Sequence, residues 1–291
     1  MGNSDKITRE FLDSLLLETR YVNAELPDTR MELWGESFST PIMTAALSHL
    51  NNIHENGMVE LAYGAKGANA LYWCGMGEDE ELEQILSTGA KVVKIIKPHA
   101  DNGEVLRKIE HAVSHGAFAV GMDIDHAFAG NGTYDVVCGL PMHPKTTEEL
   151  AMFVRHSPVP FVVKGVLSVR DAECCLEAGV SGIVVSHHHG IMDYSLPPLM
   201  VLPEILKAVD GRIPVFVDCG IESGMDAFKA LALGAAAVSV GRELMKPLKD
   251  GREAVTGRIR EMTGELAAAM ARTGIRSLAE MDASVIWRRA F

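Results

Sequence analysis

Eight short apolar segments, separated by longer amphipathic ones, constrain the fold of this 291-residue chain more than any other feature. They are rich in β-branched and aromatic residues, and such continuous apolar runs are typical of strands buried on both faces of a parallel sheet. The eight segments begin at Thr40, Ala70, Lys91, Ala117, Pro160, Gly182, Pro214 and Ala237. Eight parallel strands are also the number that closes a barrel.

The segments between these runs predict helices. The clearest lie at 79–89, 103–116, 168–179 and 223–234, and each begins with a cap residue or an acidic first turn and ends in glycine. A strand follows each glycine at once, as in STGAKVV and SHGAFAV, and this is the αβ loop of a repeated unit. We therefore predict the α/β class and a (β/α)8 TIM barrel. A doubly wound sheet is the alternative, but no GxGxxG turn supports it.

The chain contains no linker rich in Pro, Gly or Ser, so we predict a single domain. A barrel of about 250 residues with short terminal helices accounts for the length. We expect residues 1–38 to form an N-terminal helical leader, and residues 39–291 to form the barrel with its C-terminal helices.

Composition excludes several classes of protein. Hydrophobic residues make up 47% and charged residues 23%, which is ordinary for a globular protein. No apolar run reaches the roughly 18 residues of a bilayer span, and the N-terminus lacks a signal-peptide core, so we expect a cytosolic protein without a membrane partner. The net charge of −12 argues against nucleic acid as a partner. The five cysteines have no metal-type CxxC spacing and predict free thiols.

Polar residues at the predicted carboxyl ends of the strands mark the candidate site, because TIM barrels carry their catalytic groups there. Four ends are rich in them: Asp123, Asp125 and His126 after strand four, Lys164-Gly165 after strand five, Ser186-His187-His188-His189-Gly190 after strand six, and Asp218-Cys219-Gly220 after strand seven. A lysine buried at such an end requires an anion or an electron-rich ring nearby. An ion pair of Lys164 with Asp218 that only closes the barrel mouth is the structural alternative.

The run VVKGVLSVRDAECCLEAGVSGIVVSHHHG resembles the second half of the FMN-dependent α-hydroxy acid oxidase and dehydrogenase family. The resemblance is close over residues 159–245 and weaker from Pro41 to His126. Its most specific elements are KG after strand five, S-x-H-x-G after strand six, D-x-G after strand seven and GR after strand eight.

The resemblance implies FMN as cofactor and a set of catalytic roles. His188 falls on the catalytic base, Asp125 on the carboxylate that orients it, and Lys164 on the lysine beside the flavin. These roles cohere, because hydride transfer to flavin requires a base for the hydroxyl proton and a cation for the reduced ring. The expected cofactor-binding residues are Thr44, Ala45, Ala46, Lys94, Asp123, Lys164, Ser186, Asp218, Gly220, Gly241 and Arg242. The resemblance also implies a homo-oligomer, a tetramer, and no metal.

The departures from the family pattern concern the substrate and the phosphate. The two arginines that hold the substrate carboxylate are missing, since Ile191 follows Gly190 and the segment HAFAGNG follows Asp125. The family's Gln-x-Tyr on strand three reads as Lys94-Ile95-Ile96, and Glu222 and Ser223 replace its phosphate-loop arginines.

From these departures we expect an FMN-dependent oxidoreductase that acts on a carbinol carbon of a small molecule other than a simple α-hydroxy acid. The residues expected near the substrate are His126, His187, His189 and Ile191.

Three other readings remain open at this point. One is an FMN-dependent isomerase similar to type 2 isopentenyl diphosphate isomerase, although its diphosphate would require a more basic pocket. Another is a metal-dependent TIM-barrel lyase or hydrolase that uses the Asp and His cluster as ligands. The last is a barrel that retained the fold and lost catalysis.

Overall fold

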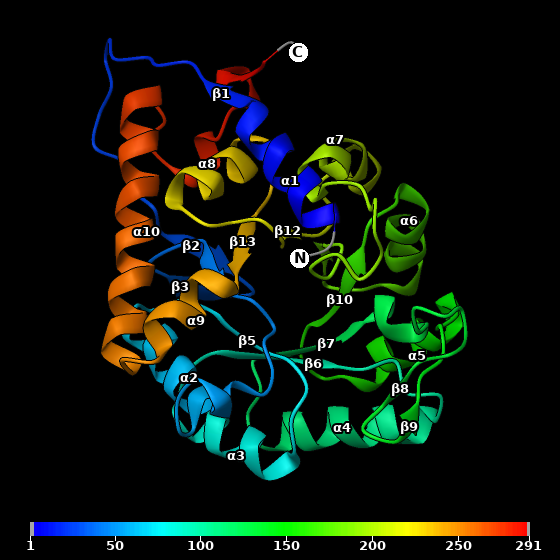
Figure 1. Cartoon of the computed structure of the whole chain (residues 1–291). Coiled ribbons are helices and arrows are strands. Elements are labelled where there is room, and N and C mark those ends of the chain that lie inside the picture. The colour runs from blue at the N-terminus through cyan, green and yellow to red at the C-terminus, as the bar shows by residue number, and fades with distance from the viewer. Residues whose placement is uncertain (1–2, 290–291) are drawn as a thin grey trace.

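A computed structural model describes residues 3–289 of the chain. Its centre is a parallel sheet of eight strands (Figure 1). In chain order they are β4 (Ile42–Thr44), β5 (Tyr72–Cys74), β6 (Val92–Ile96), β7 (Ala119–Asp123), β10 (Phe161–Val166), β11 (Gly182–Val185), β12 (Val215–Val217) and β13 (Ala237–Val240). The spatial order runs β4-β13-β12-β11-β10-β7-β6-β5. The backbone N–H of Thr44 donates to the carbonyl of Leu71 at 3.2 Å and joins the two end strands, which closes the barrel. The predicted TIM barrel is thus confirmed.

Alternate residues of each strand face two separate cores. Val93 and Ile95 belong to the cluster inside the barrel, whereas Val92 and Ile96 belong to the larger core between the barrel and its helices. Both sets are apolar, because these strands are buried on both faces.

The helices surround the barrel, and their bounds follow the predicted segments closely. They are α2 (Gly57–Gly67), α3 (Asp79–Ser87), α4 (Asn102–Ser114), α5 (Thr147–His156), α6 (Val169–Ala178), α7 (Pro198–Val209), α8 (Gly224–Ala232), α9 (Arg242–Leu248) and α10 (Arg252–Thr273). Local sequence explains several starts: Thr146 and Glu149 form a reciprocal capping box at α5, and Ser168 and Ser223 cap α6 and α8. Among residues 3–289, no helix combines the length and apolar character that a bilayer span requires.

The segment before the barrel is only partly helical. Helix α1 (Asn3–Ser14) is followed by β1 (Leu15–Leu17) and by a hairpin of β2 (Met31–Leu33) and β3 (Glu36–Phe38). The expectation of a helical leader therefore holds for α1 alone, because residues 15–17 pair as a strand with β14 (Ile286–Arg288). The domain boundary at residue 38 stays a prediction, and residues 1–2 lie outside the described part.

The hairpin and the segment after β7 cover opposite ends of the barrel. Trp34, at the hairpin turn, contacts Phe118 just before β7 and Phe216 in β12, with ring centroids 5.8 and 5.9 Å away. The hairpin thereby closes the amino-terminal end of the strands. After β7, a short helix (Ile124–Ala127) and the strands β8 (Val136–Val137) and β9 (Leu140–Pro141) extend from the carboxyl end, where the site is expected.

Close strand packing generates the first testable prediction. Gly121 lies in β7, and a Cβ there would overlap the carbonyl oxygen of Val162 in β10. We expect Gly121→Ala to lower the free energy of unfolding by about 2 kcal/mol or more, because a strand cannot yield as a side chain can. Gly257→Ala is the matched control: it lies inside α10 with open space around it, and should stabilise by about 0.5–1 kcal/mol. Urea denaturation measures both, and equal effects would contradict this packing.

Candidate active site

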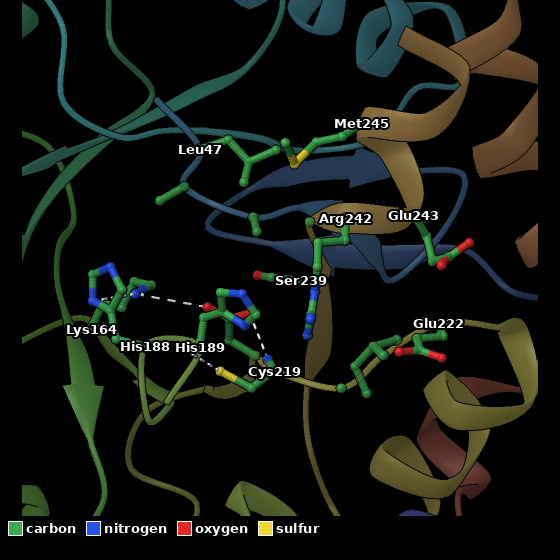
Figure 2. Close-up of a pocket in the computed structure, with 16 residues that line it drawn as sticks. Leu47, Lys164, His188, His189, Cys219, Glu222, Ser239, Arg242, Glu243 and Met245 are labelled. Atoms are coloured by element: carbon green, nitrogen blue, oxygen red, sulfur yellow. Dashed lines mark hydrogen bonds and ion pairs between the residues drawn. The ribbon is translucent and has the colours of Figure 1, made fainter. Parts of the chain in front are cut away.

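A cavity of about 390 Å³ opens at the carboxyl ends of the strands, between the segments that follow β4, β11, β12 and β13 (Figure 2). Lys164 and His188 lie at one side of it, and Arg242, Glu222 and Glu243 lie at the other. Nine of the predicted site residues line it: Ala45, Ala46, Lys164, His188, His189, Asp218, Gly220, Gly241 and Arg242. Most of the residues that the sequence predicts to bind the cofactor therefore line one cavity.

Lys164 is the buried cation of this cavity. Its Nζ lies 3.1 Å from Asp123 Oδ1 and 3.8 Å from Asp218 Oδ2. Burial would lower the pKa of the Lys164 ammonium, but the charges of Asp123 and Asp218 outweigh it and hold that pKa above its usual range. Lys164 is therefore a fixed positive charge at the barrel mouth.

Asp123 does not line the cavity; it lies beneath Lys164, between two lysines. Its Oδ2 accepts a hydrogen bond from Lys97 at 2.8 Å, and its side chain is almost fully buried. Burial would raise the pKa of the Asp123 carboxyl, yet the ammonium groups of Lys164 and Lys97 keep it well below its usual range. The prediction that Asp123 binds the cofactor is therefore not supported, because both of its oxygens already face lysines. Asp123 instead supports Lys164 from below.

Lys97 is a buried residue of this site that the sequence-based prediction omits, and Lys94 is a predicted site residue that the structure places elsewhere. Lys94 shares the outward face of β6 with Val92 and Ile96, and its Nζ donates to the carbonyl of Gly75 instead of reaching the cavity. Inward-facing residues of this segment are odd-numbered, so the inward pair with Gln-x-Tyr spacing is Ile95 and Lys97. Counting inward positions from Val93 would have found Lys97, but apolar residues on both faces of the strand hide the alternation.

His188 and Asp125 form a hydrogen-bonded pair beside Lys164. The Nδ1 atom of His188 lies 2.9 Å from Asp125 Oδ1, and Lys164 Nζ lies 3.3 Å from the same nitrogen. A carboxylate only accepts and an ammonium only donates, so we assign the Nδ1 hydrogen to the bond with Asp125. The neutral imidazole then leaves Nε2 without a proton and able to accept one.

Gly165 allows this pair to form. Its φ of +91° is in the range that favours glycine, and a Cβ there would overlap the Asp125 side chain. The KG sequence after strand five thus has a steric reason, since any side chain at position 165 would push the carboxylate away from His188.

The three consecutive histidines point in different directions. His188 and His189 adopt positive φ values of 48° and 57°, which ends the strand alternation, and both line the cavity. His187 instead lies under α1: its Nδ1 accepts from the N–H of Gly190 at 2.9 Å, so its Nε2 donates to Thr8 Oγ1 at 2.8 Å. Burial lowers the pKa of His187, as expected for a neutral structural imidazole.

The remaining predicted residues lie around the cavity and do not line it. The His126 ring contacts His188 edge-on with centroids 4.4 Å apart, and burial lowers the pKa of His126. Ile191 is 42% exposed on the outer loop. Thr44 uses its hydroxyl to accept from the N–H of Trp73 at 2.8 Å, and Ser186 Oγ accepts from the N–H of His188 at 3.0 Å.

The opposite side of the cavity combines backbone at two glycines with one arginine and two glutamates. Gly220 has a φ of +79°, and Gly241 directly precedes α9, whose first residue is Arg242. Glu222 and Glu243 line the same side. Such a glycine-rich helix start can hold an anion through its N–H groups.

A metal ion fits this site poorly. Ligand atoms of Asp123, Asp125 and His188 lie within 4.8 Å of one another, as a metal site would require. However, the lysine ammonium groups lie 2.8 and 3.1 Å from the two Asp123 oxygens, so an added cation would meet two positive charges. His187 is hydrogen-bonded to Thr8 of α1 and His189 is paired with Asp5, so neither adds a ligand to this cluster.

Comparison with known proteins agrees with this geometry. A family model described as FMN-dependent dehydrogenase matches residues 3–156 and 143–288. L-lactate oxidase of Roseobacter sp. (strain GAI101) is 30% identical over 293 residues, which cover 89% of this chain and 79% of that protein. Glycolate oxidase of Spinacia oleracea is 28% identical and covers 89% of this chain and 80% of its own.

A solved structure has the same fold and a similar sequence. Mandelate oxidase with (S)-2-phenylpropionate superposes with a TM-score of 0.88 at 28% identity, over 99% of this chain and 90% of that one. The family model spans more than half of the chain, and the relatives and the superposed structure agree with it. The chain therefore belongs to the FMN-dependent α-hydroxy acid oxidase and dehydrogenase family and is an FMN-dependent oxidoreductase.

Proposed function

We propose that this chain oxidises a carbinol carbon of a small-molecule substrate, with His188 as the base that takes the hydroxyl proton. The observation that carries the proposal is the 2.9 Å contact of His188 Nδ1 with Asp125, which leaves Nε2 free to accept that proton. The Asp125 carboxylate then stabilises the imidazolium that forms. Bound FMN supplies the acceptor for the hydride that leaves the same carbon.

The residues around the cavity fit FMN, the cofactor of this family, at the flavin side. Lys164 is a cation that faces the cavity and is fixed by Asp123 and Asp218, so it can stabilise negative charge on a reduced ring. Asp218, which lines the cavity with Ser186 Oγ 3.4 Å from its Oδ2, would bind the ribityl chain, as the family resemblance implies. The N–H groups around Gly220 and Gly241, together with Arg242, would hold the phosphate.

The substrate proposed is neutral, polyhydroxylated or carbonyl-bearing, such as a sugar derivative. His126 lies beside His188 and offers a hydrogen-bonding imidazole, and its Nδ1 lies 3.4 Å from Asp135 Oδ2. The nearby charge of Lys97 is offset by Asp123, so it is not free to bind a carboxylate as an arginine fork would.

The alternatives receive less support. The isomerase reading requires a basic pocket for a diphosphate, whereas Glu222 and Glu243 line the side that carries Arg242. The metal-dependent reading requires a cation between two lysines. A cytosolic location and a homo-oligomer, a tetramer by resemblance, remain predictions.

The role of His188 is tested by His188→Ala. We expect flavin reduction to slow by at least about a hundredfold, the usual range for loss of a general base, while flavin stays bound. Anaerobic stopped-flow absorbance measures the rate once a reducing substrate has been found by screening sugars and sugar derivatives. His156→Ala removes an exposed imidazole on α5 and serves as the control. An unchanged rate in His188→Ala would refute the assignment.

The role of Asp125 is tested by Asp125→Asn, which keeps the shape and removes the charge. Reduction should slow in the same assay, because an amide cannot stabilise an imidazolium as a carboxylate does. Asp250→Asn, an exposed change at a residue that does not line the cavity, is the matched control. Full activity of Asp125→Asn would assign Asp125 to structure and leave Asp123 as the candidate.

The proposed substrate class predicts that lactate, glycolate and mandelate are poor substrates. Burying a carboxylate without a compensating cation costs several kcal/mol, so we expect a loss on the order of a thousandfold against a good substrate. Stopped-flow mixing of the oxidised protein with millimolar concentrations of each acid measures flavin bleaching. Rapid bleaching with any of them would mean that another cation, with Lys97 the first candidate, replaces the missing arginines.

A further inference from the structure

The side of the cavity that carries Arg242 already holds an anion supplied by the chain itself. Asp5, in α1, has a side chain only 4% exposed, and its Oδ2 lies 3.4 Å from Arg242 Nη1. The same oxygen lies 2.7 Å from His189 Nδ1. Both partners line the cavity, and Arg242 is the side chain proposed above for the cofactor phosphate, so Asp5 already pairs with that arginine.

Several contacts between α1 and the loop after β11 hold Asp5 in this place. The Oγ of Ser4 donates to the carbonyl of Met192 at 2.7 Å and accepts from the N–H of Ser195 at 2.9 Å. One turn further along α1, Thr8 is hydrogen-bonded to the buried His187. Asp5 therefore belongs to an anchored helix turn, unlike a surface side chain that meets Arg242 by chance.

Two more carboxylates add to the negative charge around Arg242. Glu222 and Glu243 also line the cavity, while Arg242 is the one arginine among its described lining residues. Glu222 lies 4.0 Å from Arg9, and Glu243 has Lys246 and Arg258 as partners, so these two carboxylates are partly compensated from outside. Asp5 differs because its partners are Arg242 and His189 themselves.

We propose that Asp5 competes with the phosphate of FMN, so that the cofactor binds by exchanging its phosphate for the Asp5 carboxylate at Arg242 and His189. Both anions would use the donors that Arg242 turns toward the cavity, and two negative charges this close together repel each other. Asp5 therefore reduces the preference of the chain for FMN over a flavin that lacks the phosphate. Without Asp5, Arg242 would make that preference larger. This inference rests on the flavin site described under the proposed function.

The test compares FMN with riboflavin, which lacks the phosphate, in the flavin-depleted full-length chain. Quenching of flavin fluorescence gives a Kd for each. Asp5→Asn should tighten FMN about tenfold, because removing one nearby negative charge at this distance changes the free energy by roughly RT ln 10 or more, and should leave riboflavin within about twofold. Glu10→Gln makes the same charge change on the exposed side of α1 and should alter neither Kd.

A second variant separates competition from a loss of shape. In an Arg242→Met background, Asp5→Asn should no longer change the ratio of the two Kd values, because the shared cation is gone. Weaker FMN binding in Asp5→Asn would overturn the inference and make Asp5 a residue that positions Arg242 for the phosphate. Equal tightening of both flavins would also overturn it. A chain that takes up neither flavin, with or without Asp5, would refute the flavin site and the inference together.

Discussion

The site depends on the buried pairing of Asp123 with two lysines. Each charge would be costly alone in the barrel, and together Lys97, Asp123 and Lys164 satisfy one another within 3.1 Å. This cluster fixes Lys164 at the mouth, and Lys164 in turn lies next to the His188 ring. The proposed catalytic pair therefore lies on a layer of charges at the carboxyl ends of β6, β7 and β10.

The fold and the choice of strand ends could be predicted from sequence because both rest on local patterns. Apolar runs set the strands, glycine ends and serine or threonine caps set the helices, and the carboxyl ends of parallel strands must meet. The sequence did not predict correctly which residues around β6 face the interior of the barrel. Its residues are apolar on both sides, so period-two alternation gives no contrast, and Lys94 was chosen where Lys97 faces inward.

Other parts of the site depend on contacts that no local pattern contains. Asp5 contacts His189, and Thr8 contacts His187 across a sequence separation of 179 residues. The histidine run could be identified as important, but the direction of each ring follows from two consecutive positive φ values and from the helix above them. Lys164 and Gly165 stand out most clearly in the local sequence. Burial explains why Lys164 needs its carboxylate partner, and steric exclusion explains why position 165 is a glycine.

The small sheet formed by β1 and β14 ties the two ends of the described chain together. Helix α1 passes directly into β1, and β1 is held by Ile286–Arg288, so the turn that carries Asp5 is anchored through the far end of the sequence. This small sheet packs against α8 and α10 through Leu17 and Ile286. A shift of β14 would therefore act through β1 and α1 on the contact of Asp5 with Arg242, although no residue of β14 lines the cavity.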